Sequence, residues 1–378
     1  MQLVFKSEQM LNIILVFIPF FLISFLPEYG FVRIAFLIAC IITSLLVIVR
    51  YRIKLPQKYF IVVLAFNIII CTQFLFKIVS GTEVYPFLYL VVILSSISSL
   101  LLYVQFRNVD KDRLYAIFKT IILFHCGIFL LQFLLWYTIS FDFDLGYILK
   151  LSLSPHRAFH YDGTYRATGI YTEPSIYSSY IIALVTICFT LKNKITKCCW
   201  LGLFTCLLSF STLALIQVVL LLVICLAKIN IKNIIVGLLT ISATFYITID
   251  SLYDRYLLFQ KGSDGSNNFK LELFDVWLHQ DDFFYTGFGL VSKEGLPSYY
   301  QALGDLSLFV NNFSVYGVVF GGIISMVLVF NLLFSMVSIR SKLLFLVLTL
   351  KLSSFTSPIL SFVIAIYLGE MRDRNRND

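Results

Sequence analysis

Charge is what this sequence has least of. Asp, Glu, Lys and Arg make up 13% of its 378 residues, hydrophobic residues make up 59%, and the mean hydropathy is +0.90. A soluble globular domain has about 25% charged and about 45–50% apolar residues. The composition excludes such a domain and predicts an all-α, polytopic membrane protein. No linker or repeat divides the chain, so we expect a single domain over 1–378.

Motifs of common nucleotide-dependent and hydrolytic enzymes are missing as well. The chain has no phosphate-binding lysine loop, no H-E-x-x-H and no G-x-S-x-G. We therefore expect no nucleotide binding, no ATP hydrolysis and no cofactor. The eight cysteines show no metal-site spacing. We interpret them as small buried hydrophobes and expect no metal site.

The net charge of +8 is spread over small basic clusters between apolar runs. Such clusters are typical of topology control in membranes, where they face the cytoplasm, and not of a nucleic-acid-binding face. We therefore expect membrane lipid, and no nucleic acid, as a partner. The clusters are at 50–58, 107–113, 192–197, 228–232, 340–342 and 372–376.

A membrane-spanning helix needs about 20 apolar residues. The first apolar run follows Lys6 and lacks a small-x-small cleavage site, so it is interpreted as a retained helix. Clear runs cover 11–27, 31–49, 59–77, 86–104, 114–140, 175–191, 233–249 and 306–337.

Two further runs, 198–227 and 343–368, must each cross the membrane twice if the basic clusters share the cytoplasmic side. Their predicted tips are 209–212 and 353–358, which need shelter inside protein or beside a wet cavity. The result is about 12 spanning helices with both termini cytoplasmic. Two large loops, 141–173 and 250–305, are predicted on the external side.

The first loop concentrates polar and aromatic side chains ahead of a helix beginning at Pro174. A helix N-terminus beside guanidinium groups suits phosphate, so Arg166 and Arg157 are candidate phosphate ligands. Thr172 or Glu173 can cap the helix. Arg166 could instead pair with Asp162, and the tyrosines could form an interfacial belt. Candidate substrate-binding residues are Arg157, His160, Tyr165 and Tyr171.

The second loop adds Arg255 as a candidate catalytic cation and His279 as a candidate proton acceptor. The alternatives are an interfacial anchor for Arg255 and a solvated side chain for His279. An amphipathic helix is expected over 269–279. Asp305 and Lys351 are candidate substrate-binding residues, the lysine because polar groups at membrane depth usually face a cavity. Asp142 and Asp144 form a D-x-D pattern, a weak metal signal.

The segment from Arg166 through Gly169 to Glu173-Pro174-Ser175 resembles the Arg…Gly…(Glu/His)-Pro-(Ser/Asn) motif of O-antigen polymerases of the Wzy type. The short serine-rich run at 209–214 is similar to the helix that follows in that family. The resemblance covers about 150–340. Further positions that fit are Arg255, Trp277, Gly287, Gly289, Asn311, Asn312 and Gly317.

The resemblance implies a C-type glycosyltransferase fold in a bacterial inner (cytoplasmic) membrane, with an active site facing the periplasm or exterior. It implies a polymerase that moves a glycan from undecaprenyl diphosphate onto the non-reducing end of another lipid-linked repeat unit, without metal or nucleotide. For that reaction Arg166 and Arg255 are the candidate catalytic cations. Glu173 is the candidate base because it belongs to the family motif, although a Glu at a helix start also serves as a cap; His160, His279 and Asp305 are the alternative bases. It leaves open whether a chain-length regulator binds.

Two alternatives remain. O-antigen ligases, which transfer glycan to lipid A-core, share this architecture, although no histidine lies between Gly289 and Gly317 as the ligase pattern requires. A polysaccharide flippase could also have about 12 spans. Flippases usually show two related halves and keep polar groups within the spans, whereas here the polar groups are concentrated in the loops.

Overall fold

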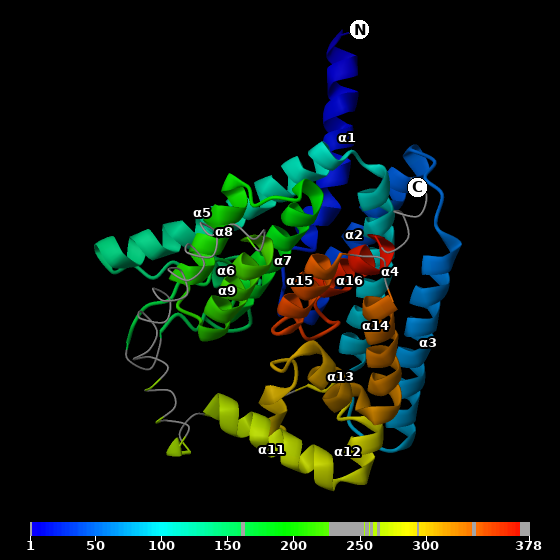
Figure 1. Ribbon diagram of the computed structural model, residues 1–378, viewed down its shortest axis with the longest axis vertical. Helices are drawn as coiled ribbons and strands as arrows, with labels where there is room; N and C mark the ends of the chain where they lie inside the picture. Colours follow the sequence, from blue (N-terminus) through cyan, green and yellow to red (C-terminus); the bar gives the residue numbers. More distant parts are fainter. Residues whose placement is uncertain are drawn as a thin grey trace. The chain divides into compact units, whose positions relative to one another are not determined.

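The computed structural model describes residues 2–159, 163–226, 265–292, 295–334 and 338–370, together with 253, 257 and 260–262. Over these ranges the chain is all-α, with one isolated β-bridge between Phe159 and Tyr165 (Figure 1). This confirms that the chain is all-α, as predicted. The run 233–249 lies outside the described residues.

Six helical segments in the described part of the chain are long and apolar enough to cross a membrane, which supports a multi-pass membrane protein. Their bounds agree closely with the predicted runs, because length of apolar sequence alone defines a spanning helix. They are α2 (Gly30–Arg50), α3 (Gln57–Val79), α4 (Pro86–Asn108), α5 (Lys111–Ile139), α7 (Pro174–Lys192) and the segment Leu308–Phe334.

That last segment consists of α13 (Leu308–Tyr316), the π-helical turn η2 (Gly317–Gly321) and α14 (Gly322–Phe334). Gly317 has φ of +72°, and a Cβ atom there would lie 2.4 Å from the backbone nitrogen of Gly287. Gly317 therefore permits a close contact between two backbone segments that no side chain would allow. The contact is made by a left-handed turn residue and not by two packed helix faces.

The described residues also contain shorter apolar helices, the first of which is Leu11–Leu22 within α1 (Gln2–Leu22). The run 198–227 is broken into α8 (Lys197–Leu208) and α9 (Thr212–Leu226), with Phe210 in a left-handed conformation at φ 49°. The run 343–368 is likewise broken, between α15 (Ile339–Thr349) and α16 (Pro358–Glu370). Both predicted breaks are confirmed.

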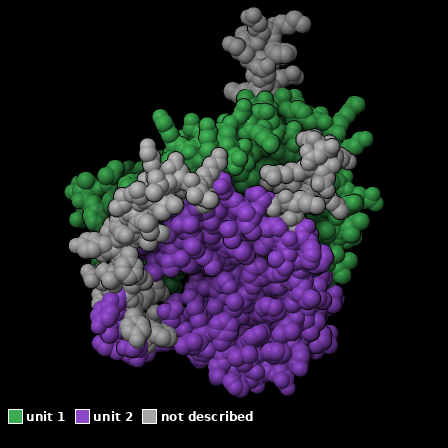
Figure 2. Space-filling view, in the orientation of Figure 1, with its two compact units in different colours: residues 1–68, 87–209, 355–378 green, residues 69–86, 210–354 purple. Residues whose placement is uncertain are grey.

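The chain divides into two compact units, coloured separately in Figure 2. Unit 1 comprises 1–68, 87–209 and 355–378, and unit 2 comprises 69–86 and 210–354. The prediction of a single domain stays a prediction. Each unit is described by itself below.

Unit 1 has two distinct ends, separated by the 29-residue helix α5, which is about 43 Å long. At one end, the amide of Glu28 between α1 and α2 donates to Leu151 O at 2.7 Å, and the amide of Leu153 donates to Glu28 Oε2 at 2.9 Å. The loop 141–173 therefore lies at the same end as the α1–α2 connection.

The opposite end of unit 1 gathers basic clusters. Lys192, at the end of α7, forms an ion pair with Asp112 in the first turn of α5. Tyr59, in the first turn of α3, packs against Tyr103 near the end of α4, with ring centroids 4.9 Å apart. The clusters 50–58, 107–113 and 192–197 therefore share one end, as the charge pattern predicted.

Unit 2 contains the second loop, and its residues from 265 are partly helical. The expected amphipathic helix over 269–279 is confirmed as α11 (Gly265–His279), which begins four residues earlier. It is followed by α12 (Asp281–Thr286) and the 3-10 helix η1 (Ser298–Ala302). The side-chain amide of Gln73, from the end of α3, donates to Thr286 O at 3.2 Å and to Val315 O at 3.3 Å.

Candidate functional site

The loop 141–173 is fixed by one buried side chain, Gln132 of α5. Its Nε2 donates to Phe143 O at 2.7 Å and to Gly169 O at 2.8 Å. Its Oε1 accepts from the amides of Thr168 at 3.0 Å and Gly169 at 2.8 Å. Gln132 is fully buried. The side-chain amide of Gln132 therefore pairs with four backbone groups near the two ends of the loop. Without it, these backbone groups would lose their hydrogen-bond partner.

A second set of polar contacts within the loop involves His156, which is buried. Its Nε2 lies 2.8 Å from Asp142 Oδ1, and its Nδ1 lies 2.7 Å from Thr168 Oγ1. The hydroxyl of Tyr165 donates to the same Asp142 oxygen at 3.0 Å. Burial and the neighbouring Asp142 raise the pKa of Tyr165 above its ordinary value, so its hydroxyl stays protonated.

The D-x-D pattern has a structural use in this loop. Asp144 accepts from the amide of Tyr147 at 2.9 Å, capping the short helix α6 (Leu145–Ile148), and from the amide of His156 at 2.7 Å. Asp142 is engaged by His156 and Tyr165, as described above. The two carboxylates hold the loop in shape.

The start of α7 brings Glu173 and Arg157 together. Arg157 Nη1 lies 3.0 Å from Glu173 Oε1, and Ser175 Oγ lies 3.3 Å from Glu173 Oε2. Glu173 occupies the N-cap position without a side-chain capping hydrogen bond. The alternative that Glu173 is a cap is therefore wrong in this structure, because its carboxylate turns to Arg157 and Ser175.

Arg166 lies in the strand-like return of the loop, beside the Phe159–Tyr165 bridge. Its amide donates to Ala158 O at 2.6 Å, and its Nη2 lies 3.5 Å from Phe159 O. Its side chain is half-buried. His160 and Asp162 lie outside the described residues, as does the pairing of Arg166 with Asp162.

Tyr165 and Tyr171 are buried, with 1% and 4% of their surface exposed. Tyr165 stacks on Trp136 with ring centroids 4.6 Å apart, and the hydroxyl of Tyr171 donates to Ser24 O. Contact with a sugar stays a prediction for both residues, and it would require the rings to leave this packing. Neither tyrosine lies in an exposed interfacial belt.

His279 is exposed in unit 2. His279 is at the end of α11, where its side chain is 75% exposed and its Nδ1 lies 3.2 Å from Asp275 Oδ1. This is the geometry of a solvated surface pair. Arg255 lies outside the described residues.

Asp305 and Lys351 are brought together, and they form an ion pair. Lys270 of α11, which the sequence analysis did not single out, joins them at 3.0 Å from the second oxygen of Asp305. Lys351 is the second residue after the end of α15, so it lies in the break of the run 343–368 and not inside a helix. Asn311 braces this group, because it accepts from Gly304 N at 2.8 Å and donates to Ser353 O at 2.9 Å.

The pKa of Asp305 lies below its ordinary value. Burial raises it, but Lys351 and Lys270 lower it by more. A carboxyl with a depressed folded pKa stabilises the fold above its unfolded pKa of about 3.9, and this contribution is lost as the pH falls through the folded value.

We therefore expect the thermal unfolding midpoint to fall below about pH 4 more steeply in the wild type than in Asp305→Asn. At pH 7 the variant should unfold at a lower temperature, because two lysines lose their shared carboxylate. Thermal unfolding in detergent between pH 3 and 7 measures both effects. Parallel curves for the two proteins would contradict this account of the cluster.

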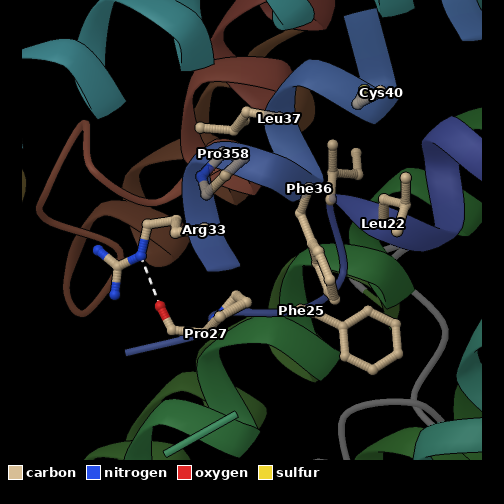
Figure 3. Close-up of a pocket in the computed structure, with 9 residues that line it drawn as sticks. Leu22, Phe25, Pro27, Arg33, Phe36, Leu37, Cys40 and Pro358 are labelled. Atoms are coloured by element: carbon tan, nitrogen blue, oxygen red, sulfur yellow. Dashed lines mark hydrogen bonds between the residues drawn. The ribbon is translucent and has the colours of Figure 1, made fainter. Parts of the chain in front are cut away.

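Arg33 is a cation that the sequence analysis missed, although a lone arginine within an apolar run is a signal of function. It lies in the first turn of α2, where its Nε donates to Pro27 O at 2.6 Å. Figure 3 shows the guanidinium at one side of a small pocket whose other walls are apolar. The lining includes Leu22, Phe25, Phe36, Leu37, Cys40 and Pro358.

Comparison with known proteins identifies no relative: the chain matches no family, no curated protein and no solved structure.

Proposed function

We propose that the chain is a membrane glycosyltransferase that polymerises oligosaccharide repeat units carried on undecaprenyl diphosphate. The observation that carries the proposal is the loop 141–173, which Gln132 holds at both ends and in which Arg157 pairs with Glu173 at the start of α7. Arg166 belongs to the same loop and contacts Phe159 O. The α1–α2 connection lies at this same end of unit 1, so Arg33 adds a further guanidinium there.

Glycosyl transfer from a lipid diphosphate requires positively charged side chains at the leaving group, which arginines supply. The bond that breaks joins C1 of the donor sugar to the diphosphate, and the bond that forms joins C1 to a hydroxyl oxygen of the acceptor. The diphosphate leaves with the electron pair, and guanidinium groups placed beside it stabilise that growing charge. Arginine is suited to this role by its fixed fork of donors and its permanent charge. Arg166 and Arg255 are proposed for it.

The proton of the attacking hydroxyl requires a base. Glu173 is proposed because it belongs to the same short segment and because Arg157 and Ser175 orient its carboxylate. Arg157 and His160 are proposed to bind substrate. In unit 2, Lys351 and Asp305 are proposed for the same purpose, and His279 is the alternative proton acceptor.

The finer architecture is also part of the proposal. About 12 spans in a C-type glycosyltransferase fold would include the six long segments and the shorter apolar helices in α1, α8, α9 and α16. They would further include α15 and the run 233–249. We place the protein in a bacterial inner membrane, with the loop 141–173 facing the periplasm or exterior and both termini in the cytoplasm.

The test is a reconstitution of the purified protein in liposomes with lipid-linked repeat units as the sole substrate, without metal or nucleotide. A polymerase converts these units into a ladder of longer lipid-linked glycans. A ligase leaves them unchanged until lipid A-core is added, and a flippase moves them between leaflets without lengthening them. Either of the last two results would overturn the proposal.

A further inference from the structure

Three cysteine thiols meet where α7 ends and α8 begins. Cys188 lies near the end of α7, and Cys198 and Cys199 lie in the first turn of α8. Their three Sγ atoms are all within 4.8 Å of one another. Cys188 and Cys199 are fully buried and Cys198 is 5% exposed. Among the described residues, no other set of three His, Cys, Asp or Glu side chains is gathered in this way.

The spacing of the sulfur atoms is close to that of a metal site. Zinc binds thiolate at about 2.3 Å, so tetrahedral ligands lie about 3.8 Å apart. The three thiols therefore need only a small closure to share one ion. Thiolates are soft ligands and select zinc and copper(I) over magnesium or calcium.

Two hydroxyl groups contact the thiols of Cys198 and Cys199. Thr196 Oγ1 lies 3.1 Å from Cys198 Sγ and 3.2 Å from Cys199 Sγ. The hydroxyl of Tyr115 lies 3.5 Å from Cys198 Sγ. Hydroxyls in these positions can donate to thiolates, and such outer contacts orient ligands in known metal sites.

The helix dipole favours the thiolate form at two of the three cysteines. Cys198 and Cys199 lie at the N-terminus of the 12-residue helix α8, where the positive end of the helix dipole stabilises an anion. The turn at 193–194 between the helices is exposed, which gives an ion a route from solvent.

We propose that Cys188, Cys198 and Cys199 bind one thiophilic metal ion such as Zn²⁺ and that the bound ion links α7 to α8. Three sulfur–metal bonds form and three thiol protons leave to solvent, with no change of oxidation state. Water or the Thr196 hydroxyl completes the coordination. The site lies at the end of α7 opposite Glu173, so it is structural and independent of the proposed glycosyl transfer.

The spacing of the cysteines along the sequence predicted no metal site. Cys188 is separated from the pair at 198–199 by a helix end and a turn, so no short motif appears. The interpretation as isolated hydrophobes still suits Cys126, which contacts Thr205 and Tyr177 in the interior.

The test uses the full-length protein, purified under reducing conditions and titrated with Cd²⁺ as a probe. We expect a thiolate-to-cadmium absorption band that saturates at one ion per chain, is displaced by Zn²⁺ and raises the unfolding temperature. Cys188→Ser and Cys199→Ala should lose the band, whereas the control Cys126→Ser should retain it. Absence of the band, or its loss in the control alone, would overturn the proposal.

A measurement on the unaltered chain covers the case in which a variant fails to fold. Zn²⁺ should protect Cys188, Cys198 and Cys199 from alkylation, as read by mass spectrometry of the peptides, and EDTA should remove that protection. Equal alkylation with and without Zn²⁺ would overturn the proposal. So would a disulfide among these thiols in protein isolated from cells with its thiols blocked at lysis.

Discussion

Arg166→Lys is expected to slow polymerisation of lipid-linked repeat units by about 100-fold or more, since loss of one donor to a transition-state oxyanion costs roughly this much. Lysine keeps the charge but replaces the planar fork of guanidinium donors with a single ammonium, which is a poorer match for a diphosphate. The loop backbone should keep its course, because the Arg166 amide still donates to Ala158 O at 2.6 Å and the side chain adds only a longer contact, from Nη2 to Phe159 O at 3.5 Å.

The matched control is Arg113→Lys, an exposed arginine in the first turn of α5, at the other end of unit 1. Its rate should stay within about twofold of wild type, because surface charges of this kind contribute little. The liposome ladder assay measures both variants. If Arg166→Lys kept more than half of the wild-type rate, Arg166 would not be a diphosphate clamp and a docking or gating role would be favoured.

Gln132→Leu is expected to destabilise the folded loop 141–173 by about 3 kcal/mol, because four buried backbone groups lose their partners together. The amides of Thr168 and Gly169 should then exchange hydrogen roughly 100-fold faster. Because Arg166 and Glu173 flank these residues, polymerisation should fall as well. Hydrogen exchange followed by mass spectrometry measures the exchange rates of the loop amides directly.

Gln105→Leu is the matched control for this change. Gln105 of α4 is equally buried, yet neither its Nε2 nor its Oε1 has a hydrogen-bond partner among the residues that the structure describes. Removing such a group relieves a desolvation cost, so the variant should be as stable as wild type or more so. If both substitutions had the same effect, the hydrogen bonds of Gln132 would not be what orders the loop.

The spanning helices could be predicted from the sequence because each depends on one local property, a long apolar run. Pro174 marks the start of α7 for the same local reason, since proline suits the first turn of a helix. The breaks at 209–211 and before Pro358 were predicted because the basic clusters on either side of each run must face the same side of the membrane. Their positions are confirmed by the helix ends at Leu208 and Thr349.

The contacts that fix the candidate site could not be predicted, because they join distant positions through irregular backbone. His156, for example, meets Asp142 and Thr168, which are 14 and 12 residues away. Lys270 joins Asp305 across 35 residues, a distance that no periodic pattern bridges. Arg33 was the exception, since its position within an apolar run is visible in the sequence alone.

The account depends on the loop 141–173 facing the outside of the cell while the basic clusters face the cytoplasm. Cysteines introduced at Ser154 in the loop and at Lys194 between α7 and α8 test this, because both positions are exposed. In spheroplasts, a membrane-impermeant maleimide should label Ser154→Cys above the background of the unaltered chain, and Lys194→Cys only after permeabilisation. Labelling of Lys194→Cys in intact spheroplasts, with Ser154→Cys protected, would contradict the account.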